Sequence, residues 1–248
     1  MKKLLFLVFI TVIAFSCNDQ TEPFELDAFG YDYYPVEQGM YWIYQVDSVV
    51  YSDLGAVKDT TRSYLKEEIV ERFIDQLGDT IFRIEREFSP TIDYDWKVKD
   101  EWATHKEPNR VTRTEENLKY IKLVFPPKEN VSWDGNSFIP EGTDLFVGGE
   151  TLDFFLNWSY KILSVDQAEN IAGVDYDEVV TIQNADSDEI DLLHRRYAVE
   201  KFAKNVGLVH KKHIILDTQC IVDCEGQTWE EKGEKGYTME ITLIEYGG

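Results

Sequence analysis

Apolar and polar residues alternate along most of the chain with the two-residue period that is typical of β-strands. Residues 40–53 are rich in aromatic and β-branched side chains, and Trp42, Tyr44 and Val46 fall on one face of the run. We therefore expect a long strand here. Pairing with other alternating strands would turn one face toward a core and leave the other to carry charged residues in water.

The segments between these runs contain turn-forming residues. Two charged runs flank residues 75–80, where Gly78 can take a positive φ, and this arrangement predicts a β-hairpin. A helix over residues 65–76 is the alternative. Two more runs flank residues 107–109, and the following run ends at Pro126 and Pro127, which a central strand does not accommodate.

Residues 133–150 have the glycine, proline, asparagine and aspartate content of a loop. Strand-like runs resume afterwards at 158–166, 175–183, 191–200, 206–217 and 237–246. About 11 strands with few helices predict an all-β fold, or a β-rich α+β fold with one or two short helices at most. We expect an antiparallel meander curled into a barrel or half-barrel. The best candidate for a short helix is 151–158.

The N-terminal segment has the pattern of a signal peptide. Lys2 and Lys3 precede an almost unbroken apolar run over residues 4–15. That run is too short for a membrane-spanning helix, which needs about 20 residues. We assign residues 1–16 to the leader, 17–30 to the new N-terminus and a tether, and 31–248 to one β-rich domain.

Cys17 directly follows this leader. Residues 14–17 resemble the lipobox of bacterial lipoproteins, although Ala14 stands where that motif usually has leucine, so ordinary signal-peptidase cleavage before Cys17 is the alternative. Cys220 and Cys224 are close enough in sequence to pair as a disulfide in an oxidising compartment, which leaves Cys17 unpaired. Lipidation would consume that thiol, and we therefore favour a lipid anchor at Cys17.

The charge of the chain excludes one class of partner. Two of the 25 basic residues but none of the 47 acidic residues precede Cys17, so the chain from Cys17 onward carries a net charge of −24. Such a surface repels nucleic acids and anionic headgroups. Membrane attachment would therefore depend on acyl chains rather than on a basic patch.

Motifs of catalysis and metal binding are absent from the sequence. It has no Gly-x-Ser-x-Gly, His-Glu-x-x-His or phosphate-loop motif, and we predict no catalytic residue, metal or cofactor. His210 and His213 would lie on opposite faces of a strand, so they would not share a metal ion. Residues 184–191 partly match a calcium loop, but Glu189 replaces its turn glycine, which favours an acidic hairpin tip.

One cluster combines carboxylates with tryptophans that could stack on a sugar ring. It comprises Asp93, Asp95, Trp96 and Trp102, and we treat these residues as a candidate ligand site. The alternative is a charged face whose aromatic side chains point into the core.

Three motifs resemble those of small lipoproteins of the Bacteroidota. They are Tyr34-Pro35 with Gly39, Trp42 and Tyr44; Trp133-Asp134-Gly135-Asn136; and Asn205-Val206-Gly207-Leu208-Val209. Asn205 replaces a glycine that is usual in that family, but asparagine also adopts positive φ, so the turn can persist. The resemblance implies an envelope location and a β-rich fold, and it transfers no activity.

These features support three functional hypotheses. The first is a non-enzymatic lipoprotein, anchored in the envelope and by expectation in the outer membrane, that binds a ligand or an envelope protein or has a structural role. The second is a carbohydrate-binding or carbohydrate-active surface lipoprotein. The third is a carrier that holds a hydrophobic ligand in a barrel cavity.

Overall fold

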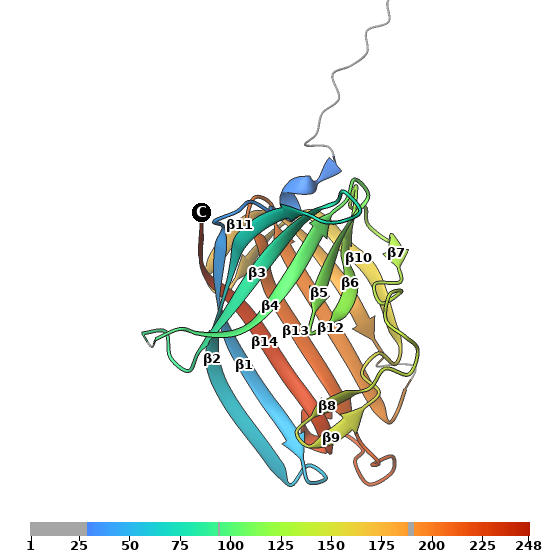
Figure 1. Ribbon diagram of the computed structural model, residues 1–248. Helices are drawn as coiled ribbons and strands as arrows, with labels where there is room; N and C mark the ends of the chain where they lie inside the picture. Colours follow the sequence, from blue (N-terminus) through green and yellow to red (C-terminus); the bar gives the residue numbers. More distant parts are fainter. Residues whose placement is uncertain (1–28, 94, 188–190) are drawn as a thin grey trace, which may run out of the picture.

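The computed structural model describes residues 29–93, 95–187 and 191–248. Twelve strands of this part of the chain form one antiparallel sheet, and two more form a separate hairpin (Figure 1). No helix in the described segments is long and apolar enough to cross a membrane. The elements are the 3₁₀-helix η3 (Tyr31–Tyr33), β1 (Tyr41–Ser52), β2 (Val57–Ile74), β3 (Thr80–Ser89), β4 (Lys97–Lys106), β5 (Arg110–Glu115), β6 (Leu118–Val124), β7 (Ser132–Trp133), β8 (Leu145–Val147), β9 (Glu150–Leu152), β10 (Trp158–Ile171), β11 (Val174–Asp186), β12 (His194–Ala203), β13 (Gly207–Asp217), α2 (Trp229–Lys232) and β14 (Lys235–Gly247).

The sheet consists of two meanders joined by the first and last strands. Its order is β6-β5-β4-β3-β2-β1-β14-β13-β12-β11-β10-β7. β1 pairs with β14 from Tyr41 opposite Gly247 to Tyr51 opposite Gly236, with one irregularity after Ile43. The two halves of the chain therefore meet in the middle of the sheet.

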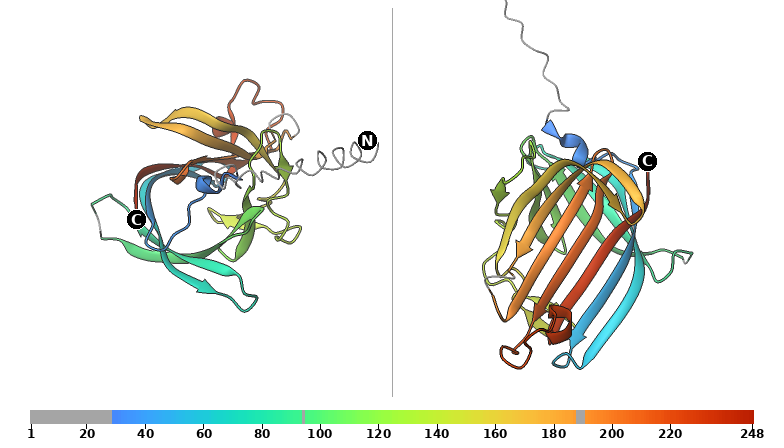
Figure 2. Two further views of the ribbon diagram at one scale, coloured as in Figure 1. Left: turned by 90° about the horizontal axis from the view of Figure 1, so that it is seen from above. Right: turned by 180° about the vertical axis from the view of Figure 1, so that it is seen from behind.

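The sheet curls into a half-barrel but does not close (Figure 2). No strand ladder in the described residues joins the edge strands β6 and β7. Two hydrogen bonds connect these edges at one end: Ile121 N donates to Gly135 O at 2.8 Å, and Trp133 Nε1 donates to Ile121 O at 2.9 Å. The predicted all-β class is thus confirmed, and the sheet is an open one.

Alternation along each strand places the core on the concave side. On β1, for example, Trp42 and Tyr44 are buried while their neighbours are partly exposed. One apolar cluster gathers β1, β2 and β3 with the turn before β13, and a second gathers Tyr33 and Tyr34 with β5, β6, β10 and β11. Residues after η3 therefore fill the upper end of the half-barrel.

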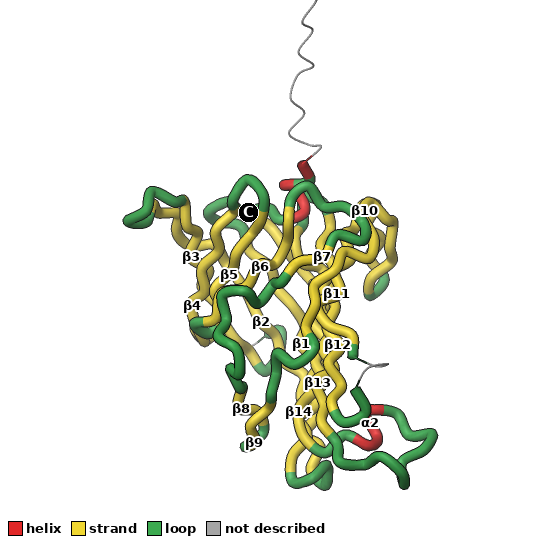
Figure 3. Tube along the Cα trace, turned by 90° about the vertical axis from the view of Figure 1, so that its right-hand side faces the viewer, coloured by secondary structure: helices red, strands yellow, loops and turns green. Residues whose placement is uncertain are grey.

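One expectation about helices was wrong. Residues 151–158 form the end of β9, a turn and the first residue of β10, because Phe154 and Trp158 pack into the core in a turn where Asn157 has a φ of 61°. The hairpin predicted around residues 75–80 is confirmed, because β2 continues to Ile74 and pairs with β3, and the alternative helix over residues 65–76 does not form. Within the described residues the α-helix is α2, which lies on the outer side of the sheet (Figure 3) and begins with a capping box between Thr228 and Glu231.

The first two described residues contact the folded body. Phe29 stacks on Tyr31 with ring centroids 5.6 Å apart, and Gly30 contacts the ring of Pro127. The predicted signal peptide, Cys17 and the predicted tether up to residue 28 lie outside the described residues.

Candidate ligand cavity

The lower half of the half-barrel encloses a cavity of about 500 Å³ on its concave side, called the ligand cavity below. Ligand sites of small molecules typically have about 300–1,000 Å³, so this one is large enough for a small ligand. Its walls come from β4, β5, β6, β10, β11, β12, β13 and β14, and β8 also lines it. The β8–β9 hairpin lies in front of the lower part of the sheet (Figure 1).

The β8–β9 hairpin is positioned by its glycine turn and by one buried anchor. Gly148 and Gly149 have φ values of 61° and 87°, which suits the tight two-residue turn between β8 and β9. A Cβ at Gly148 would lie 2.8 Å from Val50 Cγ1, so the turn approaches β1 closely. Leu152 is fully buried and packs with Ile215, which fixes the hairpin to the sheet.

One wall of the cavity is aromatic. Phe154, Trp158, Tyr160 and Tyr237 line it, and the rings of Phe154 and Trp158 have centroids 5.0 Å apart. Trp158 Nε1 donates to Phe154 O at 2.6 Å, so the indole is fixed in place. Tyr120 on β6 also lines the cavity and is only half-buried, and its ring centroid lies 6.2 Å from that of Phe155, which contacts Phe154.

The other wall carries buried ion pairs that cross the interior. Lys122 on β6 donates to Glu200 Oε1 on β12 at 2.6 Å, although these strands are far apart in the sheet order. Lys211 Nζ lies 3.4 Å from the same oxygen, and Glu115 Oε1 lies 3.4 Å from Lys122 Nζ. The sheet must curl for these groups to meet, and the pairs in turn connect its two halves.

Charge coupling fixes the ionisation of this wall. Burial alone would raise the pKa of Glu200, but the ammonium groups of Lys122 and Lys211 outweigh it and hold that pKa below its ordinary value. Burial would also lower the pKa of Lys122, and the carboxylates of Glu115 and Glu200 raise it instead. Glu200 and Lys122 therefore stay charged at neutral pH.

A second set of ion pairs lies above the cavity. Glu67 accepts from Arg86 at 3.0 Å and from Arg113 at 2.6 Å. Both guanidinium groups lie over Trp102, with Cζ atoms 3.3 Å and 4.6 Å from the ring centroid. The void beside them has only about 30 Å³, which suits water, so of these two hollows the ligand cavity is the one that admits a larger ligand.

Two further polar side chains face the ligand cavity. His213 Nδ1 lies 2.9 Å from the hydroxyl of Tyr237, and burial together with the charges of Lys211 and Lys122 lowers the pKa of His213 well below 6.5. Asn184 is 1% exposed, and its Nδ2 donates weakly to Glu200 at 3.5 Å. Its Oδ1 has no hydrogen-bond partner among the described residues.

The candidate ligand residues from the sequence lie in two different environments. Asp93 and Asp95 are exposed in the loop before β4, and Trp96 is half-buried there. Trp102 lies on the concave side of β4 against Arg86 and Arg113 and does not contribute an exposed ring to that loop. The residues that line the cavity were not selected from the sequence.

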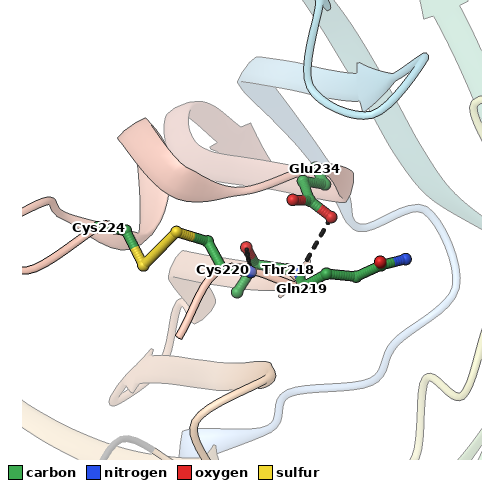
Figure 4. The surroundings of a disulfide bond; sticks show 5 residues. All are labelled: Thr218, Gln219, Cys220, Cys224 and Glu234. Carbon is green, nitrogen blue, oxygen red and sulfur yellow. Dashed lines mark hydrogen bonds between the residues drawn. A yellow bond between two sulfur atoms is a disulfide. The ribbon is translucent and has the colours of Figure 1, made fainter. Parts of the chain in front are cut away.

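The cysteines and histidines are placed as follows. Cys220 and Cys224 form the predicted disulfide in the loop after β13, with Cα atoms 6.0 Å apart (Figure 4). His210 faces outward and contacts Glu240 at 2.9 Å, whereas His213 faces the cavity. Within the described residues, no group of three His, Cys, Asp or Glu side chains is arranged to hold a metal ion.

Comparisons with known proteins found similarity only at the level of structure. No protein-family model matches the chain, and no curated protein matches its sequence. One similar solved structure is described as a "putative lipoprotein" from Parabacteroides distasonis, with 10% identity, a TM-score of 0.41, and coverage of 87% of this chain and 98% of that chain. Another, from Bacteroides fragilis, is described as a "putative exported protein with YmcC-like fold", with 10% identity, a TM-score of 0.37 and the same coverage. We draw no functional conclusion from either.

Proposed function

We propose that this protein is an exported envelope lipoprotein whose half-barrel binds a small ligand on its concave side. The observation that carries the binding role is the ligand cavity of about 500 Å³, lined by aromatic rings and buried ion pairs. The apolar leader and Cys17 support export and a lipid anchor in the outer membrane.

A binding role fits this site better than catalysis. Glu115 and Glu200 are held as carboxylates by lysines, and the positive charges lower the pKa of both groups despite their burial. A general acid would need a raised pKa instead. The wall is therefore suited to hydrogen bonding and to keeping a fixed shape.

The alternative of a hydrophobic carrier has weaker support. An apolar ligand that filled the cavity would displace water from Lys122, Glu200 and Asn184 without replacing its hydrogen bonds, which costs free energy. A ligand with polar groups avoids that cost.

The anchor is tested by metabolic labelling of expressing cells with an alkyne analogue of palmitate. We expect the wild type to be labelled and to enter the detergent phase, and Cys17→Ser to lose both properties. A wild-type protein that is unlabelled and soluble would contradict the anchor. Protease treatment of whole cells then distinguishes the periplasmic face from the cell surface.

The binding role is tested by native mass spectrometry of the full chain purified from its own envelope. We expect a bound small molecule that is retained under gentle ionisation. A protein that carries no adduct, and that no compound of a broad metabolite library stabilises in thermal shift assays, would contradict the binding role.

A further inference from the structure

We propose that the ligand cavity binds a neutral saccharide unit. This proposal rests on the proposed binding function and specifies the class of its ligand. The inference comes from three properties of the cavity: its balanced charge, one buried acceptor without a partner, and its aromatic walls.

The first property is that the charged groups of the wall already pair with one another. Lys122 and Lys211 both contact Glu200, and Lys99 Nζ lies 3.3 Å from Asp100. An anionic ligand would have to take a lysine from its carboxylate, and a cationic ligand would have to take a carboxylate from its lysine. Either exchange breaks a buried ion pair, so the wall favours a ligand without net charge.

The same argument disfavours a zwitterion such as a free amino acid. Its two charges would each compete with an existing partner inside the wall. A hydroxyl group, in contrast, can accept a hydrogen bond from Lys122 or donate one to Glu200 without separating the pair. Hydrogen bonds to ionised groups are also stronger than those between neutral groups.

The second property is the carbonyl oxygen of Asn184. The side chain is almost fully buried, it lines the cavity, and Oδ1 accepts no hydrogen bond from the described part of the chain. An acceptor that is buried in this way lowers stability unless a donor satisfies it. A ligand hydroxyl is a donor of the size that the cavity admits.

The third property is the aromatic surface of the cavity. Trp158, Tyr237 and Tyr120 line it, and these three rings are half-buried. A pyranose presents C–H groups on its faces and hydroxyls around its rim. Its faces could contact these rings while its rim reaches Glu200 and Asn184.

The test uses the full chain purified in detergent from expressing cells. A glycan array with neutral, acidic and amino oligosaccharides is probed first, and each binder is then titrated by calorimetry. We expect binding of neutral oligosaccharides and at least about tenfold weaker binding of the uronic-acid and free-amine analogues of the same sugars.

Variants then assign the binding to this cavity. Asn184→Leu keeps a similar volume but removes the acceptor, and we expect about tenfold weaker binding with an unchanged or higher Tm, because the buried group without a partner is gone. A purely structural role of Asn184 would instead lower the Tm.

Asn170→Leu on the exposed end of β10 is the matched control and should bind normally. Tyr120→Leu should weaken binding in a chain with intact Asn184.

Different failures have different meanings. If acidic sugars or amino acids bind instead, and Asn184→Leu weakens their binding, the binding function stands and the neutral-saccharide inference fails. If neutral sugars bind but neither Asn184→Leu nor Tyr120→Leu affects them, the assignment to this cavity fails. If no array compound binds and the purified protein carries no ligand, both the inference and the binding function are overturned.

Discussion

Arg196 on β12 is the largest side chain in the described protein that is fully buried. Its Nη1 donates to Asp217 Oδ1 at 2.7 Å, and its Nε and Nη2 donate to Asp153 O at 3.1 Å and 2.8 Å. The guanidinium thus satisfies a buried carboxylate and a carbonyl in the turn after β9. This one residue holds the segment that leads from the β8–β9 hairpin into the aromatic wall.

Replacing Arg196 with methionine should therefore destabilise the protein strongly. Methionine fills much of the volume, but Asp217 and Asp153 O lose their donor, and breaking a buried pair in this way costs about 3–5 kcal/mol. Chemical denaturation followed by circular dichroism measures the loss. Arg62→Met is the control, because Arg62 pairs with Asp47 in solvent and its loss should leave the unfolding free energy nearly unchanged. Equal effects of both variants would contradict this role of Arg196.

His213 makes stability depend on pH in a defined range. Burial and the charges of Lys211 and Lys122 lower its pKa in the folded state well below 6.5, although Glu115 opposes the shift. As the pH falls through about 6.5, His213 therefore takes up a proton in the unfolded chain but not in the folded chain. The free energy of unfolding should decrease as the pH falls below about 6.5.

His213→Asn should remove this decrease, because asparagine does not titrate. Denaturation curves at a series of pH values check this between neutral pH and about 5. Carboxylates with a lowered pKa, such as Glu67 and Glu200, also contribute to the free energy of unfolding. That contribution is lost only below the ordinary carboxyl pKa of 4.5, so it affects a separate pH range. A wild-type slope that survives in His213→Asn would disprove the assignment.

At the scale of elements, the turn after β7 closes one end of the half-barrel. Gly135 O accepts from Ile121 N, Trp133 Nε1 donates to Ile121 O, and the Tyr160 hydroxyl donates to Asn136 Oδ1 at 3.2 Å. A Cβ at Gly135 would overlap the ring of Tyr160. The glycine is thus required by close packing between this turn and β10.

Gly135→Ala should cost about 1–3 kcal/mol, the usual range for overpacking a tight site. The added methyl group must push the Tyr160 ring aside and weaken the contacts between the two edges of the sheet. Thermal unfolding measures the change, and faster amide exchange at Ile121 would locate it. Ser132 lies on β7 just before this turn and is exposed, so Ser132→Ala should have almost no effect. Amide exchange at Ile121 that stays unchanged would count against a closing role for this turn.

The long strands could be predicted because their alternation is a local property of the sequence. Asn205, with a φ of 60°, also keeps the turn that was expected from its ability to replace glycine. The error at 151–158 has a tertiary cause, since Phe154 and Trp158 are placed by contacts with β13 and β14 rather than by local propensity. The short strands β7, β8 and β9 were missed because two or three residues show no period.

The candidate site could not be predicted because its residues are far apart in the sequence. Lys122 and Glu200 meet only if the chain ends pair and the sheet curls, and strand order cannot be derived from periodicity. One signal was present in the sequence. Glu200 lies two residues from Ala198 and from Phe202, so the alternation of β12 places its carboxylate on the same buried face as these apolar residues. The search of the sequence grouped Asp93, Asp95 and Trp96, which are neighbours along the chain in the loop before β4 and do not line the ligand cavity.

At the scale of the whole molecule, the central pairing of β1 with β14 makes the two ends of the folded chain part of one sheet. Met40 and Gly248 are in contact, and the C-terminus lies at the end of the sheet where η3 enters (Figure 1). Contacts that join the halves, such as Lys122 with Glu200, form only when this pairing is present. The fold should therefore unfold as one cooperative unit.

This topology predicts that the chain tolerates a circular permutation. A Gly/Ser linker of about 12 residues, with a mean reach of about 20 Å, would join Gly248 to Phe29. New ends between Glu141 and Gly142 would open an exposed loop and lose two turn hydrogen bonds, from Thr143 N and Thr143 Oγ1 to Pro140 O. All strand pairings of the sheet stay intact in this permutant.

We expect that permutant to show one cooperative transition by circular dichroism and tryptophan fluorescence. A second permutant with new ends between Lys211 and Lys212 is the control, because it cuts β13 between its partners β12 and β14 and should not fold. Two separate transitions in the first permutant would mean that the halves fold independently. Continuity of the chain through the loop between β7 and β8 would then contribute more to cooperativity than the central β1–β14 pairing.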